Sequence, residues 1–319
     1  MTFRLAVAAL AAFGVDAAFA QSSYPAKPVR LVNGQAAGGS ADILGRSVAE
    51  PLGKALGQSI VVENRAGAGG NIGTGEVATA APDGYTLLIG YVGTLAVNPW
   101  LYKSVPFDPV ESFQNIVGLA DVPLALVTRA EFPARTLDEL IGVAKTRLLT
   151  FGSAGNGTMN HMNGELINTT AGIRTQHIPY KGVAFSVTDV LGGQIDMSYA
   201  SMPSVVQHIR SGKLKALAVS SPQRVNALPD VPTMLESKLA PVSVSTWYSL
   251  MAPKGTPMPI VMRVNAEVVK ILDTPAMRER LDALGAVPWP VGPDQLLATI
   301  KDDLARWEKI VKASGAKLD

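Results

Sequence analysis

The chain has 319 residues, of which 47% are hydrophobic and 17% are charged. This balance excludes a disordered chain, and the length allows two domains of ordinary size. The formal net charge of +2 is too small to indicate binding to nucleic acid or a membrane surface, and the absence of cysteine excludes disulfide bonds and thiolate metal sites.

Residues 1–20 have the pattern of a secretory signal peptide. Arg4 gives a positive start, residues 5–15 form a short apolar core, and Ala18 and Ala20 give the small-residue pattern of a cleavage site. The core is shorter than the roughly 20 residues that span a bilayer, so we expect cleavage near Ala20 instead of a membrane anchor. A lipoprotein would need a cysteine at that site, so we expect a soluble mature protein in a bacterial periplasm.

The first part of the mature chain alternates strands with helices. Three runs of β-branched and aliphatic residues predict strands at residues 29–32, 59–63 and 86–89. Apolar residues at helical spacing predict a helix over Ser40–Leu56 that ends at Gly57, and another helix that continues through Val77 and Ala80. This alternation predicts a parallel sheet with helices on its faces.

Two glycine-rich loops each lie between an expected strand and an expected helix. The first is Gln35-Ala-Ala-Gly38-Gly39-Ser40-Ala-Asp42, and the second is Ser153-Ala-Gly155-Asn-Gly157-Thr158-Met-Asn-His161. A helix that starts after such a loop presents unpaired backbone N–H groups and the positive end of its dipole at one point, which favours an anion. We expect Ser40 to cap its helix and Asp42 to hold the turn. The two loops together predict a carboxylate gripped between two lobes.

The rest of the chain predicts a second α/β unit and a return to the first. Helices are expected at residues 136–145, 159–169, 183–191, 203–211, 259–271, 275–284 and 293–313. Strands are expected at residues 116–119, 122–128, 149–151, 176–179, 195–199, 216–220 and 242–251. We expect the chain to cross between the units near 122–128 and 242–251. Such a path predicts a hinge and a cleft between lobe 1, residues 21–122 and 247–319, and lobe 2, residues 123–246.

Two motifs that suggest an enzyme lack the required spacing. In the cluster from Gly67 to Gly73, Ile72 stands where a dinucleotide-binding loop needs glycine, so we expect a tight turn before a helix. Ser153 lacks the preceding glycine of a hydrolase elbow, because Phe151 stands there.

Other candidate residues leave alternatives open. His161 and Glu165 share one face of a helix but are too few for a typical metal site, so His161 lies either at the cleft or in the core. Trp247 and Tyr248 either wall a ligand pocket or pack against the opposite lobe.

Motifs spread over the whole mature chain carry a resemblance to a known family. In chain order they are Tyr24-Pro-x-Lys-Pro28, Gly38-Gly39-x-x-Asp42, Val62-Glu-Asn-Arg65-x-Gly-Ala-Gly-Gly70-Asn-Ile-Gly73, Ala81-Pro-Asp-Gly-Tyr85-Thr-Leu-Leu, Gly152-Ser153-Ala-Gly155-x-Gly157, His177-x-Pro-Tyr-Lys-Gly182, Gly212-Lys-Leu-Lys-Ala-Leu-Ala-Val219, Leu228-Pro-Asp-Val-Pro-Thr233 and Ala252-Pro-x-Gly-Thr-Pro257. With these motifs the chain resembles the Bug family, the periplasmic substrate-binding proteins of tripartite tricarboxylate transporters.

The resemblance implies an α/β periplasmic binding protein of type II, a two-lobed Venus flytrap with a hinge of two crossing strands. Such a protein binds a small carboxylate and delivers it to a membrane permease. The resemblance therefore implies no catalysis, no cofactor, no metal and no nucleic-acid partner, and it implies a monomer.

In the family, backbone groups and ordered water of the two glycine loops hold the ligand carboxylate. Carried over to this chain, the implied ligand-binding residues are Ala37, Gly38, Gly39, Ser40, Asp42, Tyr91 and Gly93 in lobe 1 and Ser153, Ala154, Gly155, Gly157, Thr158 and His161 in lobe 2.

The chain departs from the family pattern at two places. Gln35 lies where the first loop is usually hydrophobic, and its amide can both donate and accept hydrogen bonds. Ala200, followed by Ser201, lies where the family commonly has an aspartate that could pair with a ligand ammonium group. Amino acids are therefore less expected as ligands than dicarboxylates, aromatic acids or uncharged polar solutes. Gln35, Ala200, Ser201 and Trp247 complete the candidate site.

Two other functions remain open. A secreted α/β serine hydrolase or esterase would use Ser153 or Ser40 and would need a serine–histidine–acid triad in space. A sensor that passes ligand occupancy to a membrane kinase would have the same fold, and the sequence does not separate it from a transport protein.

Overall fold

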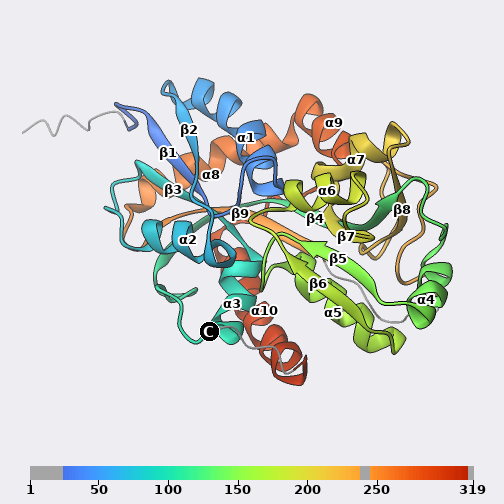
Figure 1. Ribbon diagram of the computed structural model, residues 1–319. Coiled ribbons are helices and arrows are strands. Elements are labelled where there is room, and N and C mark those ends of the chain that lie inside the picture. Colours follow the sequence, from blue (N-terminus) through green and yellow to red (C-terminus); the bar gives the residue numbers. More distant parts are fainter. Residues whose placement is uncertain (1–23, 238–244, 315–319) are drawn as a thin grey trace, which may run out of the picture.

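The computed structural model describes residues 24–237 and 245–314. The expected signal peptide, residues 1–20 with its cleavage site near Ala20, and the start of the expected return crossing, residues 242–244, lie outside the described residues. The described strands form one curled ten-stranded sheet in the order β2-β1-β3-β9-β4-β7-β5-β6, to which β8 and β10 add by pairing with β4. Figure 1 shows the two halves of this sheet side by side, with β4 and β9 between them.

The first half begins with three parallel strands, as the alternation predicts. β1 (Val29–Asn33) pairs with β2 (Ile60–Asn64) on one side and with β3 (Thr86–Tyr91) on the other. Between them run α1 (Ser40–Leu56) and α2 (Asn71–Ala78).

The structure at the two ends of α1 confirms the predicted stop at Gly57 and corrects the predicted cap at Ser40. Gly57 ends the helix with a φ of +78°, a conformation that glycine adopts without strain. At the other end the cap is Gly39, so the prediction for Ser40 is wrong: Ser40 is the first helical residue, and no side chain caps the helix. Asp42 holds the turn as expected, because its Oδ2 accepts a hydrogen bond from the backbone N of Gly38 at 3.0 Å.

A helical segment that the sequence does not predict follows β3. It consists of a short π-helix, Gly93–Val97, and α3 (Asn98–Leu101). Before α2, the glycine cluster forms the tight turn expected there, a 3₁₀ turn over Ala68–Gly70.

The centre of the sheet corrects two expectations. β4 (Phe113–Arg129) is a single 17-residue strand, where two separate strands are expected at residues 116–119 and 122–128. Up to Pro123 it pairs antiparallel with β9 (Ser245–Pro253), and from Leu124 it pairs antiparallel with β7 and β8. β9 is also antiparallel to β3, so the sheet is mixed and not parallel throughout.

The second half repeats the alternation around β4. Its strands are β5 (Leu149–Ser153), β6 (Thr175–Pro179), β7 (Met197–Ser201) and β8 (Leu214–Val219). Its helices are α4 (Leu137–Thr146), α5 (Met159–Ala171), α6 (Val183–Leu191) and α7 (Met202–Arg210). β5 is parallel to both β6 and β7, so the carboxyl ends of these strands meet at one edge.

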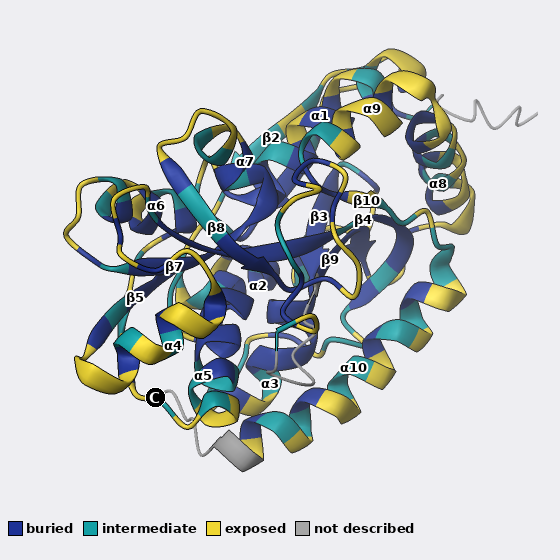
Figure 2. Cartoon of the chain, turned by 90° about the vertical axis from the view of Figure 1, so that its right-hand side faces the viewer, coloured by how far each residue is buried: buried dark blue, intermediate teal, exposed yellow. Residues whose placement is uncertain are grey.

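The last part of the chain returns to cover the first half. Its elements are α8 (Met258–Asp273), α9 (Pro275–Ala283), β10 (Val287–Pro288) and α10 (Pro293–Ser314). α8 packs against α1 and β4, and α10 packs against β4, α3 and the π-helix. Figure 2 shows the central strands of the sheet buried and the outer faces of these helices exposed, as the apolar periodicity of the helices predicts. No described helix is long and apolar enough to cross a membrane.

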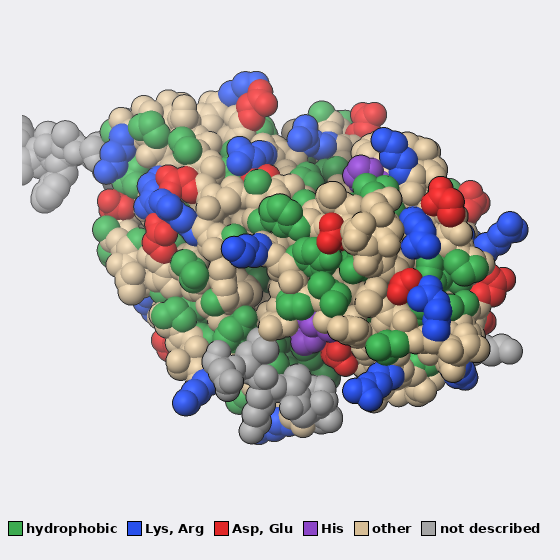
Figure 3. Space-filling model, in the orientation of Figure 1, with side chains coloured by type: hydrophobic (Ala, Val, Ile, Leu, Met, Phe, Trp, Pro, Cys, Tyr) green, Lys and Arg blue, Asp and Glu red, His purple; other side chains and the backbone are tan. Residues whose placement is uncertain are grey.

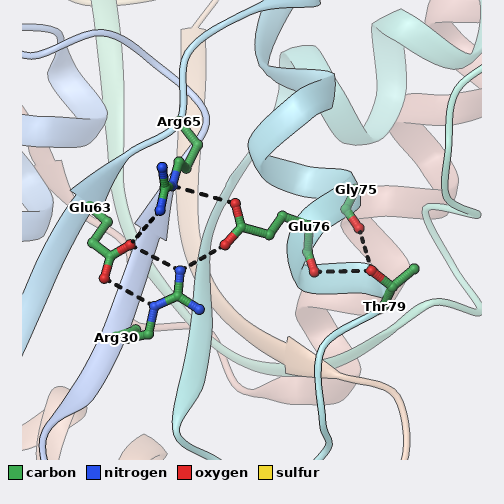
Figure 4. A network of polar contacts seen from close by, with 6 residues as sticks. All are labelled: Arg30, Glu63, Arg65, Gly75, Glu76 and Thr79. Carbon is green, nitrogen blue, oxygen red and sulfur yellow. Dashed lines mark hydrogen bonds and ion pairs between the residues drawn. The ribbon is translucent and has the colours of Figure 1, made fainter.

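A charged network joins β1, β2 and α2 beside the turn at Ala68–Gly70. Arg30 contacts Glu63 of β2 at 2.9 Å and Glu76 of α2 at 2.7 Å, and Arg65 contacts both carboxylates (Figure 4). The Arg30 guanidinium, through its hydrogen bonds, lowers the pKa of Glu63. The network fixes the position of α2 relative to the sheet. Elsewhere on the face drawn in Figure 3, acidic and basic side chains are interspersed.

Candidate functional site

A cavity of about 470 Å³ lies between the two halves of the sheet. Its walls are the loops that follow β1, β2, β5 and β6, together with Tyr91 of β3 and the first residues of β9. Residues from both glycine-rich loops line it, Gly39 from the first and Gly155 and Thr158 from the second. The two loops are therefore brought together as the sequence predicts.

Five helices begin at this cavity in the described part of the chain. Their N-cap residues are Gly39 (α1), Gly70 (α2), Thr158 (α5), Gly182 (α6) and Ser201 (α7), and all five line the cavity. Only the α5 cap uses its side chain, since Thr158 accepts a hydrogen bond from the backbone N of His161; the caps of the other four helices make no such bond. Unpaired N–H groups and positive dipole ends of several helices thus meet at one place, which favours an anion.

The side chains of the cavity agree with an anion site. Among the described residues that line it, none is acidic and Lys181 is the one charged residue. Burial raises the pKa of Tyr248 to about 12, so its hydroxyl group stays protonated and can donate a hydrogen bond at neutral pH. Burial also raises the pKa of Tyr91, whose hydroxyl group donates to the backbone O of Gly69 at 2.5 Å.

The backbone of the first loop is held by two side chains, Asn33 and Asp42. The backbone N of Gln35 donates to Asn33 Oδ1 at 2.9 Å, and the Gln35 carboxamide lies near the hydroxyl groups of Tyr91 and Tyr248, which line the cavity with it. Asp42 bonds Gly38 N and also pairs with Arg46 at 2.9 Å. Asp42 is thus occupied with the loop itself and does not line the cavity.

The second loop rests on two stacked histidines. Ser153 Oγ accepts a hydrogen bond from Gly155 N at 3.0 Å and lies 2.6 Å from His177 Nε2. His161 Nδ1 accepts a hydrogen bond from Gly157 N at 3.3 Å, and the rings of His161 and His177 stack with their centroids 4.0 Å apart. Ser153 and His161 therefore stabilise the backbone of the second loop through these hydrogen bonds, and neither residue lines the cavity.

The contact between Ser153 and His177 does not form an accessible catalytic triad. Ser153 is completely buried and lies outside the cavity wall. No carboxylate among the described residues forms a hydrogen bond with His177, which a triad would need to orient the imidazole. The described residues also contain no group of three or more histidine and carboxylate side chains that could hold a metal, although Glu165 lies 3.8 Å from His161.

Seven of the candidate residues line the cavity, namely Gln35, Gly39, Tyr91, Ala154, Gly155, Thr158 and Ser201. Ten do not, namely Ala37, Gly38, Ser40, Asp42, Gly93, Ser153, Gly157, His161, Ala200 and Trp247. Ala200 lies inside β7 opposite Ala125 and is fully buried, so position 200 faces the core and not the cavity. Trp247 packs outside the cavity, where its indole N–H donates to Asp303 of α10 at 2.7 Å.

The sequence misses several residues of the wall. Two more loops contribute, Ala66–Gly70 after β2 and Tyr180–Val183 after β6, because the carboxyl ends of parallel strands meet at one edge. Thr246 and Tyr248 line the cavity whereas Trp247 does not, because successive residues of a strand point to opposite faces. That alternation alone predicts that Trp247 and Tyr248 do not both line the pocket. Other missed residues are Gly34, Ala36, Tyr102, Leu124, Asn156, Met159 and Asn160.

We expect the stacked histidines to weaken the fold on acidification. Burial lowers the pKa of His161 to about 4, and burial together with His161 lowers that of His177 to about 3. An unfolded chain binds these protons at a pKa of about 6.5. The contribution of the pair to the free energy of unfolding is therefore complete above pH 6.5, and it is lost as the pH falls toward 4 and then 3. For His161 the loss in the free energy of unfolding is about 1.4 kcal/mol per pH unit.

Urea denaturation between pH 7.5 and 4.5 measures this loss. Compared with the wild type, His161→Gln combined with His177→Gln should show a shallower fall in the free energy of unfolding. His208→Gln, on α7 and outside the stacked pair, is the control and should follow the wild type. Equal slopes for the wild type and the double variant would contradict the expectation.

Comparisons with known proteins agree with the fold. Residues 44–316 match the family described as the tripartite tricarboxylate transporter family receptor. The chain is 38% identical to the periplasmic binding protein BugD, and the two structures superpose with a TM-score of 0.89 over 92% of this chain and 99% of BugD.

Two further solved relatives hold a small acid. Rpa4515 of R. palustris, solved with adipate, is 32% identical, with a TM-score of 0.90 over 92% of this chain and 100% of Rpa4515. MatC from Rhodopseudomonas palustris, solved with bound malate, is 33% identical, with a TM-score of 0.85 over 90% of this chain and 100% of MatC. These similarities confirm the two-lobed periplasmic binding fold, and the chain belongs to the receptor family of tripartite tricarboxylate transporters, together with the Bug proteins.

Proposed function

We propose that this protein binds a small carboxylate in the cavity and delivers it to the membrane permease of a tripartite tricarboxylate-type transporter. The convergence of five helix N-termini on a wall without acidic side chains, in the described part of the chain, carries the proposal. Each hydrogen bond to a carboxylate contributes about 1.5–3 kcal/mol, so a few N–H groups suffice for tight binding. The adipate of Rpa4515 and the malate of MatC support an acid of this size.

The proposed lobes are residues 21–122 with 247–319, and residues 123–246. The exchange of partners in β4 between Pro123 and Leu124 supports this division, as does the pairing of Ser245, the first residue of β9, with Pro123. Two hydrogen bonds join the lobes beside the cavity, from Ser204 Oγ to Gly38 O at 3.1 Å and from Tyr102 OH to Asn156 O at 3.2 Å. A ligand that bonds both loops favours this closed arrangement, because the open form offers only one set of donors.

We propose that the protein catalyses no reaction and that it acts in the periplasm after cleavage near Ala20. The burial of Ser153, away from the cavity, supports binding without catalysis. The membership of a periplasmic receptor family supports the location.

A thermal-shift screen of the protein from Gln21 onward tests the function. The panel contains dicarboxylates, tricarboxylates, aromatic acids, amino acids and sugars. A carboxylate should stabilise the protein in a saturable way, by about 2.7 kcal/mol at 100 times its dissociation constant. Stabilisation by a sugar or another neutral solute, and by no carboxylate, would contradict the proposal.

A further inference from the structure

The dipeptide Asn-Gly occurs three times in the chain, at Asn33-Gly34, Asn156-Gly157 and Asn163-Gly164. Asparagine is a thermolabile residue, and it is most labile before glycine, because glycine has no Cβ atom to keep its backbone N away from the preceding side chain. In that reaction the backbone N attacks the side-chain carbonyl carbon, and the asparagine loses its amide group. The structure separates the three pairs by how free the asparagine is to react.

Two of the pairs lie in regular, buried structure. Asn33 is the last residue of β1 and is fully buried, and its Oδ1 accepts a hydrogen bond from the backbone N of Gln35 at 2.9 Å. Asn163 is fully buried inside α5. At both places the side chain cannot rotate onto the next backbone N without disrupting the close packing around it. These two pairs are therefore matched controls within the same chain.

Asn156 differs from both, because it is exposed and lies in a turn of the second glycine-rich loop. Among the described residues its carboxamide forms no hydrogen bond, while its backbone O accepts one from the hydroxyl group of Tyr102 at 3.2 Å. Gly157 has a φ of +79°, a conformation that glycine adopts without strain. The carboxamide of Asn156 is therefore free to rotate toward the backbone N of Gly157.

A proton acceptor lies beside that backbone N. The N–H group of Gly157 donates a hydrogen bond to His161 Nδ1 at 3.3 Å. Burial lowers the pKa of His161 to about 4, so the imidazole is neutral at pH 7 and its Nδ1 keeps the lone pair that faces this N–H group. A backbone amide is a poor nucleophile until it loses its proton, so this contact assists the attack.

We propose that Asn156 is a site of spontaneous deamidation and that His161 accelerates the reaction as the proton acceptor. His161 Nδ1 takes the proton from Gly157 N, the nitrogen bonds to Cγ of Asn156, and a succinimide ring closes. The C–N bond of the side-chain amide breaks, and its nitrogen takes up the proton and leaves as ammonia. Water then opens the ring at either carbonyl carbon, which gives aspartate or isoaspartate at position 156.

The product changes the charge of the cavity wall. Asn156 lines the cavity, and none of the described residues that line it is acidic. A carboxylate at position 156 repels the carboxylate ligand that the proposed function places in the cavity, and isoaspartate also lengthens the main chain of the loop. We therefore expect stored protein to lose ligand affinity while it stays folded. This consequence rests on the proposed function, whereas the reaction does not.

Peptide mapping by mass spectrometry, on protein stored at mildly alkaline pH, tests the reaction. Conversion should appear at Asn156, while Asn33 and Asn163 of the same sample stay unchanged. Conversion at Asn156 that is no faster than at these two buried residues would overturn the site.

The His161→Asn variant tests the proton acceptor. Asparagine offers an acceptor oxygen near the place of Nδ1 but is not a base, so conversion at Asn156 should slow. If His161 only held the loop, the variant would convert at the wild-type rate or faster, because a loosened loop lets the side chain rotate more freely. Either of these results would overturn the role of His161.

Two further variants test the consequence by calorimetric titration with malate, adipate and the other acids of the screening panel. Asn156→Asp carries the charge of the product and should bind the acid about tenfold more weakly than the wild type, since solvent screens part of the repulsion. Asn156→Gln keeps the amide but would have to close a larger ring, so it should keep the wild-type affinity before and after storage.

The outcomes separate the two claims. Wild-type affinity in Asn156→Asp, or a loss of affinity on storage that Asn156→Gln shares, would show that deamidation does not switch off binding. If no acid of the panel binds any of these proteins, the proposed function fails, and peptide mapping still decides the reaction.

Discussion

The Gly182→Ala variant is expected to bind its carboxylate more weakly than the wild type, by up to about 100-fold, because overpacking of this kind costs up to about 3 kcal/mol. A Cβ atom at position 182 would lie 2.6 Å from the Cβ of Ala36. Gly182 follows β6 in one half of the sheet and Ala36 follows β1 in the other, so the clash arises between the two walls of the cavity. Ala36 has no flexible side chain that could move aside, so the walls must separate.

The same substitution should leave the unfolding midpoint unchanged. Gly182 has a φ of 165°, which is extended backbone that alanine also adopts, so the loop itself is not strained. Gly142→Ala is the control, since nothing lies within 4 Å of that added Cβ in α4. It should keep full affinity and gain roughly 0.5–1 kcal/mol of stability, as expected for alanine in place of glycine within a helix. Wild-type affinity in Gly182→Ala would mean that ligand binding does not need the contact between these walls.

The Ser201→Asp variant is expected to lose about 100-fold in affinity for the carboxylate, whereas Ser201→Asn should stay within a few-fold of the wild type. Ser201 is the N-cap of α7 and lines the cavity. Aspartate and asparagine are both preferred N-caps, so both variants should keep or strengthen the helix. Only aspartate adds a negative charge, and two like charges about 5 Å apart at a partly buried site repel by about 3 kcal/mol.

Calorimetric titration of both variants with the acid found in the screen measures this difference. Thermal unfolding without the acid checks that both variants fold. If aspartate and asparagine changed the affinity by the same factor, the ligand would not be held as an anion at the end of α7.

The elements that the sequence predicts best are those with a clear start and stop. The bounds of α6 and α1 agree with the structure, because each has apolar residues at helical spacing and follows a glycine, Gly182 or Gly39. The continuity of β4 was not predictable in the same way, because Ala120 and Asp121 separate the two apolar runs that predict strands. Within the first run, the backbone of Trp289 lies against Gly118, a contact with a residue far along the chain.

In the candidate site, too, the sequence predicts local features but not the contacts between distant segments. Loop composition alone indicates that Gly39 and Thr158 precede helices and lie near an anion. The same loops also contain side chains that hold the backbone, such as Asp42 and Ser153, and composition does not separate these from residues that reach the cavity. Tyr180–Val183 and Thr246 join the wall only through the approach of the two lobes.

A crystal structure of the protein with the stabilising acid tests the central claim most directly. We expect a carboxylate in the cavity, within hydrogen-bonding distance of backbone N–H groups in the first turns of α1 and α5, directly or through one water. An acid bound elsewhere, or bound in the cavity with its carboxylate away from every helix N-terminus, would contradict this claim.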